Sequence, residues 1–169
     1  MKGNKNNIIL IGMPGVGKST IGVVLAKILG YKFVDSDLVI QEKTGRLLKD
    51  IIAQDGIDEF VKIENEINAG LDVEKSIIAT GGSVVYGEEA MEHLREIGTI
   101  VYLKLDLYSL SRRLGSLEKR GVVLKKNQTL KDLFYERTPL YKKYADIIVN
   151  EHGCSITDTV NKIVKKLEE

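Results

Sequence analysis

The sequence has few of the features that mark secreted or membrane-spanning proteins. Its single cysteine, Cys154, excludes an intrachain disulfide and fits a reducing compartment. No stretch approaches the ~20 apolar residues that a spanning helix needs. The apolar run IILI at residues 8–11 is too short for the core of a secretory signal. These absences predict a cytoplasmic protein that does not enter membranes.

The chain also has no excess of charge of one sign. Its 25 basic and 24 acidic side chains leave a net charge of +1, which gives no electrostatic reason to bind nucleic acid or an anionic membrane. Repeats and low-complexity tracts are absent too. With 169 residues, 43% of them hydrophobic, we expect one folded domain, 1–169, acting as a monomer.

Short, β-branched apolar runs alternate along the chain with segments of helical periodicity. The predicted strands are 8–11, 31–34, 76–79, 100–103 and 146–149. The predicted helices are 20–29, 37–54, 59–71, 88–97, 107–114, 130–144 and 156–167. Continuous apolar strands separated by helices predict an α/β fold, a doubly wound, five-stranded parallel sheet with helices on both faces.

Two intervals interrupt this alternation. Residues 36–72 carry more helix than one crossover between parallel strands needs, and we expect a helical substrate-binding insertion there. Residues 115–127, GSLEKRGVVLKKN, hold glycines and basic side chains without a clear period. Such a segment in a compact domain predicts a surface loop or a mobile lid.

The strongest motif is GMPGVGKST at residues 12–20, which follows the first predicted strand and opens a helix. Its pattern, G-x-x-x-x-G-K-S, lets backbone amides and a helix N-terminus surround phosphate oxygens. Lys18 can reach the β- and γ-phosphates, and the Ser19 hydroxyl can bind Mg²⁺. We therefore expect ATP to be bound by Gly12, Gly15, Val16, Gly17, Lys18, Ser19 and Thr20.

This motif alone does not identify the reaction, because GTPases, ATPase motors and small-molecule kinases share it. The chain lacks an Asn-Lys-x-Asp motif for reading guanine, and it is too short for the additional modules of a motor. Both absences favour a small-molecule kinase.

Two carboxylates, Asp35 and Asp37, follow the second predicted strand in the sequence VDSD. If the strand continues through them, they point the same way, ~6.5–7 Å apart, at the edge where open α/β sheets bind ligands. One would then hold the metal, and the other would orient or deprotonate an attacking hydroxyl. The alternative is that Ser36 or Asp37 only caps the next helix.

The third strand ends in TGGS, where Gly81 and Gly82 leave backbone amides open to a ligand, although a tight turn explains the same pair. Arg137 lies in the predicted helix 130–144, within ERTPLYKKYA. On helical position alone it is a solvated arginine.

Together these motifs resemble the shikimate kinase family of P-loop, nucleoside-monophosphate-kinase-like proteins, over nearly the whole chain. The resemblance rests on the cradle GMPGVGKST, VDSD for the family's D-x-D, TGRLLKDIIAQDG, TGGS for T-G-G-G, SRRLGSLEKRG and ERTPLYKKYA for R-x-P-L-Y-x-x-x-A. It implies ATP-dependent phosphorylation of a small hydroxylated acid, with shikimate the first candidate and Mg²⁺ as cofactor.

The resemblance also implies roles for individual residues. Asp35 would help to hold the metal with Ser19, and Asp37 would bind the acceptor hydroxyls and act as base. Gly81 and Gly82 would line the acceptor site, and Arg137 would bind the acceptor carboxylate.

Two further arginines belong to the nucleotide side of this resemblance. Arg113 would stack on adenine. Arg120 would close with the lid over the transferring phosphoryl group, where its charge stabilises the transition state together with Lys18.

The chain departs from the family pattern at the acceptor site. Where the family has D-G-E-x-x-F-R, this chain has DGIDEFV, so that Ile57 replaces a glutamate and Val61 replaces an arginine that binds the acceptor carboxylate. Ser83 replaces a glycine, and Gly121 replaces the proline after the lid arginine. Loss of one charge-assisted contact would cost ~2–4 kcal/mol of binding.

These departures leave two alternatives to shikimate phosphorylation. One is a kinase for another small alcohol, such as a hydroxy amino acid or a sugar acid with a more apolar side. The other is a nucleotide-binding regulatory module that no longer transfers phosphate. The presence of Lys18, Ser19, Asp35, Asp37 and Arg120 argues against the second.

Overall fold

A computed structural model describes residues 6–115 and 127–169. Its centre is a five-stranded, fully parallel sheet in the order β2-β3-β1-β4-β5. The strands are β1 (Asn7–Ile11), β2 (Lys32–Asp35), β3 (Ser76–Ala79), β4 (Gly98–Lys104) and β5 (Ile147–Asn150). Each predicted strand is therefore present within one or two residues of its expected bounds, and the predicted sheet is confirmed.

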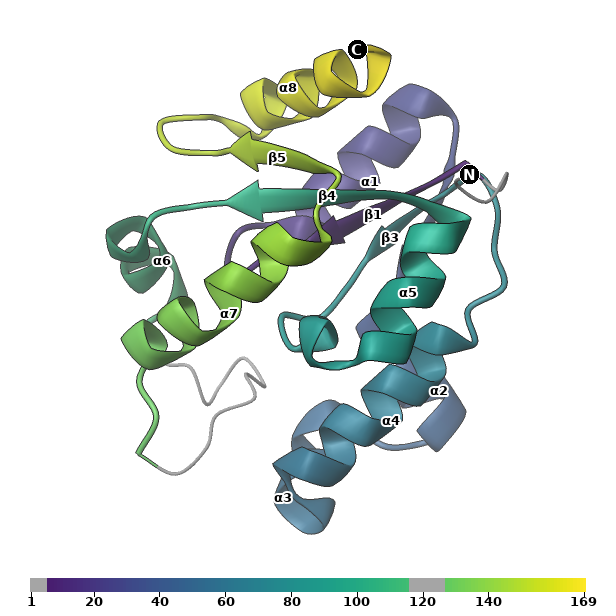
Figure 1. The fold of residues 1–169 in the computed structure, drawn as a ribbon, viewed down its shortest axis with the longest axis vertical. Helices are drawn as coiled ribbons and strands as arrows, with labels where there is room; N and C mark the ends of the chain where they lie inside the picture. The colour runs from purple at the N-terminus through teal and green to yellow at the C-terminus, as the bar shows by residue number, and fades with distance from the viewer. Residues whose placement is uncertain (1–5, 116–126) are drawn as a thin grey trace.

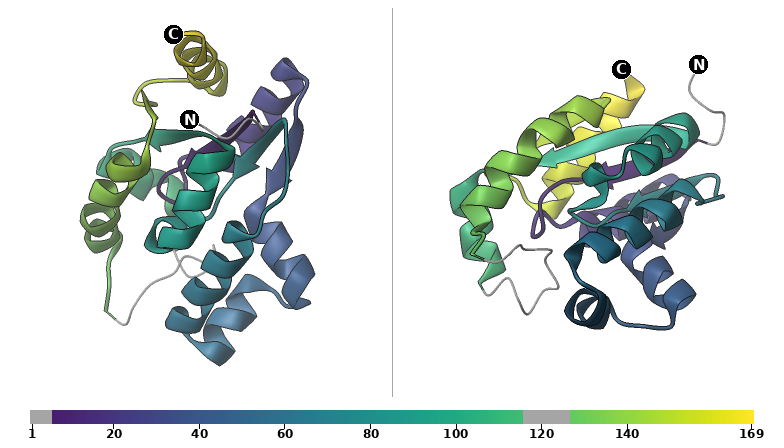
Figure 2. Two further views of the ribbon diagram at one scale, coloured as in Figure 1. Left: turned by 45° about the vertical axis from the view of Figure 1, so that its right-hand side comes forward. Right: turned by 60° about the horizontal axis from the view of Figure 1, so that its bottom comes forward.

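Helices connect the strands and cover both faces of the sheet (Figures 1 and 2). They are α1 (Lys18–Leu29), α2 (Ser36–Thr44), α3 (Leu48–Asp55), α4 (Ile57–Ala69), α5 (Glu88–Ile97), α6 (Leu107–Leu114), α7 (Leu130–Tyr144) and α8 (Ile156–Glu168), with a 3₁₀ turn η1 (Val84–Tyr86). In Figure 1, α5 and α7 lie in front of the sheet and α1 lies behind it, in contact with α8. The chain is thus doubly wound.

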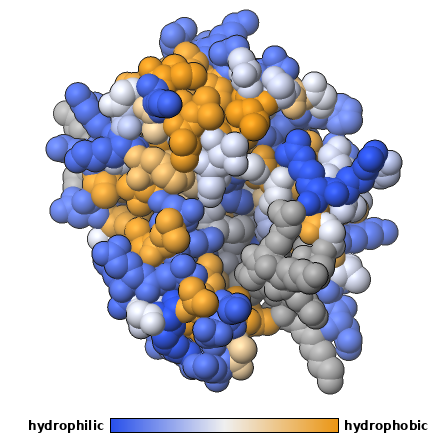
Figure 3. Space-filling model, turned by 180° about the vertical axis from the view of Figure 1, so that it is seen from behind, coloured by the Kyte–Doolittle hydropathy of each residue, from blue (hydrophilic) through white to orange (hydrophobic). Residues whose placement is uncertain are grey.

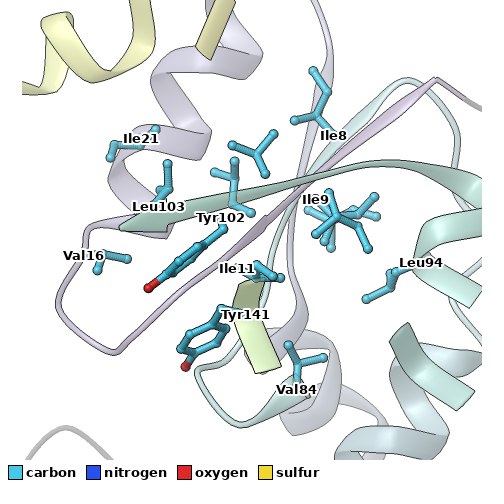
Figure 4. Packing of buried hydrophobic residues seen from close by; sticks show 14 of the residues in the cluster. Ile8, Ile9, Ile11, Val16, Ile21, Val84, Leu94, Tyr102, Leu103 and Tyr141 are labelled. Atoms are coloured by element: carbon cyan, nitrogen blue, oxygen red, sulfur yellow. The ribbon is translucent and has the colours of Figure 1, made fainter. Parts of the chain in front are cut away.

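The main core forms where β1, the central strand, and its neighbour β4 meet the helices on either face. Residues Ile8–Ile11 are at most 5% exposed, as expected for strands covered on both sides. Figure 4 shows this packing at close range, with Tyr102 of β4 beside Tyr141 of α7. The two rings stack with centroids 5.2 Å apart, and the Tyr141 hydroxyl donates to the Gly82 carbonyl at 2.6 Å. The core thereby fixes the glycines that follow β3.

The segment after β2 forms a helical group of α2, α3 and α4, seen below the sheet in Figure 1. It has a small core of its own, made by Ile40, Ile51 and Phe60. The single helix predicted over 37–54 is wrong, because α2 ends at Thr44 and is capped by Gly45. Gly45 has a φ of 67° and donates its N–H to the Gln41 carbonyl, which is a common helix ending with a left-handed glycine.

Within residues 6–115 and 127–169, none of the helices combines the length and the apolar character needed to cross a bilayer. Seen from behind, hydrophobic side chains gather over the upper half of the surface, among hydrophilic ones (Figure 3). Val23 and Ile28 of α1 are about half exposed, which is ordinary for a folded surface.

The first residue of the sheet, Asn7, links three segments through its side chain. It is 1% exposed, donates to the carbonyls of Val73 (2.8 Å) and Ile97 (3.1 Å), and accepts from the Ser76 N–H at 3.0 Å. Buried polar groups that lose such partners carry a desolvation cost.

We therefore predict that Asn7→Ala lowers the free energy of unfolding by about 2–4 kcal/mol, measured by urea denaturation. The matched control is Asn150→Ala at the exposed end of β5, where the lost bond to the His152 N–H should cost less than about 1 kcal/mol. Equal losses in the two variants would contradict the role given to Asn7.

Candidate active site

The phosphate cradle joins β1 to α1, at the carboxyl edge of the sheet. Gly12 has a φ of 151°, and a Cβ on it would lie 2.7 Å from the Leu103 carbonyl oxygen, so that only glycine fits there. Gly17 caps α1 with a φ of 90°. The N-terminus of α1 therefore opens into the loop with its first amide groups available to an anion.

Lys18 is 8% exposed and folds back over this loop. Its Nζ donates to the carbonyl oxygens of Gly12 (2.6 Å) and Met13 (3.0 Å). Burial lowers the pKa of Lys18 to about 8, partly offset by the negative charge of Asp37. The ammonium group is thus held at the mouth of the cradle.

The two residues expected to bind the metal lie next to each other. Ser19, in the first turn of α1, donates its hydroxyl to Oδ2 of Asp35 at 3.3 Å, and both side chains retain access to solvent. A hydroxyl and a carboxylate oxygen are the ligand types that Mg²⁺ prefers. The pair therefore fits a magnesium ion bound to a nucleotide phosphate.

The strand geometry predicted for Asp35 and Asp37 is wrong. Asp35 ends β2 and caps α2, with its Oδ1 accepting from the N–H groups of Asp37 (3.0 Å) and Leu38 (3.3 Å). Asp37 lies in the first turn of α2, where the two-residue repeat of a strand no longer applies. The capping carboxylate is therefore Asp35, and the helix turn directs Asp37 into a cavity.

That cavity has a volume of about 300 Å³ and lies beside the phosphate cradle. Its lining contains Lys18, Ser19, Asp37, Gly81, Gly82 and Arg137. Burial and the nearby Asp35 carboxylate raise the pKa of Asp37 to about 6. The fold thus brings the expected phosphate-binding and acceptor-binding residues to one space.

Its helical position alone suggested that Arg137 is solvated, but the structure buries it. It is 1% exposed, its Nε donates to the Tyr86 hydroxyl at 3.3 Å, and its guanidinium lies 5.4 Å from the centre of the Tyr86 ring. A Cβ on Gly82 would meet its Nη1 at 2.9 Å. The absence of a side chain at Gly82 therefore makes room for the arginine at the cavity wall.

Val61 also faces a cavity and not bulk water. It lies on α4, is half-buried, and lines a second space of about 210 Å³ together with Ile57, Leu133 and Arg137. Arg137 borders both cavities. The apolar replacements at positions 57 and 61 thus give this space an apolar side, although Asp58, Gln128 and Glu136 also line it.

Sequence reasoning missed Glu64, a buried carboxyl group in the acceptor cavity. It is 1% exposed and lines the cavity with Asp37. Burial raises its pKa to about 7, against the effect of a hydrogen bond from Ser83. The signal available was weak, because position 64 follows Phe60 by one helical turn and reads as an ordinary solvated glutamate.

A third cavity, of about 330 Å³, lies on the other side of the cradle. It is lined by Val16, Gly17, Thr20, Arg113 and Glu151 among others, and the Arg113 guanidinium donates to the Gly15 carbonyl at 3.3 Å. Arg113 therefore lies beside the cradle, and its contact with the nucleotide base stays a prediction. Arg120 and residues 116–126 of the predicted lid lie outside the described residues.

Comparison with known proteins places these residues in a family. The model of the shikimate kinase family matches residues 14–168. The chain belongs to the shikimate kinase family. This confirms the resemblance drawn from the sequence motifs and the prediction of a small-molecule kinase with an alcohol group as acceptor.

Individual relatives agree with this assignment. A shikimate kinase from Francisella tularensis subsp. novicida is 39% identical over 96% of this chain and 95% of its own, and one from Thermodesulfovibrio yellowstonii is 36% identical over the same shares.

Solved structures show the same fold. Shikimate kinase from Acinetobacter baumannii in complex with shikimate superposes with a TM-score of 0.86 at 30% identity, over 97% of this chain and 93% of that one. A gluconokinase from Sinorhizobium meliloti is similar in fold, with a TM-score of 0.54 at 15% identity.

Within this shikimate kinase-family site, Glu151 is a second carboxyl group that sequence reasoning missed. It follows β5 and is 3% exposed, and its Oε2 has no hydrogen-bond partner in the described part of the chain. Burial raises its pKa to about 7 from an ordinary value of 4.5, against the effect of the Arg113 and Lys18 charges. The folded protein therefore favours the neutral form of Glu151 more than the unfolded chain does.

This shift makes stability depend on pH. Because the folded pKa is raised, the stability conferred by neutral Glu151 is complete below about pH 4.5 and is lost as the pH rises through about 7. Glu151→Gln, which stays neutral, should be more stable than wild type at pH 8 by about 1–3 kcal/mol and similar to it at pH 4.5, by urea denaturation. Glu168→Gln, an exposed carboxyl group of α8, is the control. A Glu151→Gln variant that is less stable at both pH values would contradict this assignment.

Proposed function

We propose that this protein transfers the γ-phosphoryl group of ATP to a hydroxyl group of shikimate, giving shikimate 3-phosphate. The observation that carries the proposal is that Lys18, Asp37 and Arg137 line one cavity beside the cradle, in a chain of the shikimate kinase family. Lys18 is a cation suited to the ATP phosphates, and Asp37 is a carboxylate suited to a shikimate hydroxyl group. Arg137 is a cation suited to the shikimate carboxylate.

On the nucleotide side, the cradle amides and Lys18 bind the β- and γ-phosphates and stabilise negative charge as the phosphoryl group moves. Gly12, Gly15, Val16, Gly17 and Thr20 shape this side, and Arg113 contacts the base. Arg120 of the predicted lid over 115–127 lies outside the described residues, and its role in stabilising negative charge on the transferred group stays a prediction.

Ser19 and Asp35 would hold Mg²⁺, since their oxygens lie 3.3 Å apart beside the cradle. The ion supplies positive charge to the β- and γ-phosphate oxygens when it is bound. Among the described residues there is no cluster of three or more His, Cys, Asp or Glu side chains able to bind a metal by itself. A nucleotide-bound magnesium ion, with phosphate and water as its other ligands, accords with this.

On the acceptor side, Asp37 orients the attacking hydroxyl and accepts its proton, for which a pKa near 6 leaves the carboxylate ionised at neutral pH. Arg137 binds the shikimate carboxylate, and Gly81 and Gly82 let the ring approach the backbone. The helical group at 36–72 acts as the acceptor-binding insertion, because α2 and α4 contribute Asp37 and Glu64 to the cavity.

A coupled assay of ADP release tests this function. Shikimate should raise turnover far above the rate without acceptor, and chelation of Mg²⁺ should abolish it. Asp37→Asn should lower kcat about 10²- to 10⁴-fold while nucleotide binding persists.

Asp50→Asn is the matched control, because Asp50 of α3 does not line the cavity and its loss should leave turnover unchanged. Turnover by wild type that stays at the rate without acceptor would refute the proposal.

Val61 provides a second test, because it lies beside Arg137 at the position of a carboxylate-binding arginine in the family pattern. If shikimate is the acceptor, Val61→Arg adds a second cation for its carboxylate. We predict that the KM for shikimate falls by about tenfold or more, since such contacts contribute at least about 1.4 kcal/mol.

Val61→Met, which is of similar length but uncharged, is the control and should not lower this KM. A Val61→Arg variant that loses activity with shikimate would instead favour another acceptor, whose apolar side occupies the space lined by Val61 and Ile57.

A further inference from the structure

The buried face of α4 is partly polar. The fully buried residues of this helix are Phe60, Glu64 and Asn68, which lie one helical turn apart on a single stripe. Phe60 packs in the small core of the helical group, and the Asn68 amide donates to the Glu64 carbonyl at 2.8 Å. The Glu64 carboxyl group is directed into the acceptor cavity. A buried carboxyl group requires hydrogen-bond partners.

Ser83 supplies one such partner. Its hydroxyl donates to Glu64 Oε1 at 2.6 Å, across a pair of residues that are 3% and 1% exposed. Ser83 immediately precedes η1 and stands where the family motif has a third glycine. The hydrogen bond therefore depends on a side chain that the family pattern lacks at this position.

The second oxygen of Glu64 points toward Asp37. Glu64 Oε2 and Asp37 Oδ1 both have no hydrogen-bond partner in residues 6–115 and 127–169. Each would lie 2.8 Å from a Cβ placed on Gly81, so the two oxygens converge on the same point of the cavity wall. Two buried acceptor atoms directed at one point fit a ligand with hydroxyl groups.

Burial and the Asp37 charge favour the neutral form of Glu64, against the charges of Arg137 and Lys18. The charged groups that face it are Asp37 of α2, Arg137 of α7 and Lys18 of α1, while Val61, one turn earlier on α4, is apolar. Burial raises the pKa of Glu64 to about 7. At neutral pH a substantial fraction of Glu64 is protonated and can donate a hydrogen bond, while Asp37 accepts one.

We propose that Ser83 is a positioning residue for the acceptor: its hydrogen bond fixes Glu64 so that Glu64 Oε2 and Asp37 Oδ1 together bind the hydroxyl groups of the acceptor. This inference rests on the proposed function and extends it, because it assigns hydroxyl recognition to Glu64 and Ser83 as well as to Asp37. It gives this chain a second polar contact for the acceptor. The chain lacks a cationic contact at Val61, where the family pattern has an arginine.

Ser83→Ala tests the inference through its effect on the acceptor alone. The KM for shikimate should rise about 5- to 30-fold, as expected for loss of one hydrogen bond to a carboxyl group, while the KM for ATP stays unchanged. Ser83→Thr keeps the hydroxyl and should retain most of the wild-type affinity. Ser76→Ala removes another buried serine hydroxyl, one that donates to the Glu74 carbonyl, and is the control with no effect on either KM.

A double-mutant cycle then asks whether Ser83 acts through Glu64. Glu64→Ala should raise the KM for shikimate at least as much as Ser83→Ala, and the double variant should be no worse than Glu64→Ala alone. Thermal unfolding checks that each variant is folded. If Glu64→Ala does not fold, the comparison of Ser83→Ala with Ser83→Thr decides the question.

The outcomes separate the two proposals. A wild-type enzyme that does not turn over shikimate would overturn the proposed function and this inference together. An active wild-type enzyme would leave the function in place, and the inference alone would be overturned by an unchanged KM in Ser83→Ala, by equal losses in Ser83→Ala and Ser83→Thr, or by effects of Ser83→Ala and Glu64→Ala that multiply independently.

Discussion

The constraint on which the rest of the site depends is the burial of the Lys18 ammonium group. An ammonium group removed from water must find acceptors, and here two carbonyl oxygens of the cradle loop, those of Gly12 and Met13, provide them. The loop can turn these carbonyls inward only because Gly12 has no side chain to meet Leu103. Lys18 therefore holds the loop in its phosphate-binding shape before any nucleotide is present.

One buried cation also explains the composition of the neighbouring cavity. Asp37 and Glu64 bring negative charge toward Lys18 and Arg137, and the four groups come from four different helices. Each charged group is less costly to bury beside the opposite charges, although Asp37 and Glu64 repel each other, as do Lys18 and Arg137. Burial is the main cause of the raised pKa values of Asp37 and Glu64 and of the lowered pKa of Lys18, so the opposite charges do not fully offset the cost of burial. The hydroxyl groups and carboxylate of the acceptor, together with the phosphates of ATP, would supply further partners for these buried groups.

Features with a local sequence signal could be predicted from the sequence. Features that depend on contacts between distant parts of the chain could not. The five strands and the cradle have local signals, since apolar runs and the G-x-x-x-x-G-K-S spacing lie within a few residues. Glu64 and Glu151 have none, because their burial depends on helices and strands far away in the chain. The geometry of Asp35 and Asp37 also depended on where β2 ends, which is the least reliable part of such a prediction. Family resemblance, and not periodicity, indicated that Arg137 faces a ligand.

The most direct test of the account is a crystal structure of the protein with Mg²⁺, ADP and shikimate. The account predicts ADP phosphates in the loop at residues 12–20, the shikimate carboxylate within hydrogen-bond distance of Arg137, and a ring hydroxyl within hydrogen-bond distance of Asp37 Oδ1. Shikimate bound with its carboxylate away from Arg137, or outside the cavity shared by Lys18 and Asp37, would contradict it.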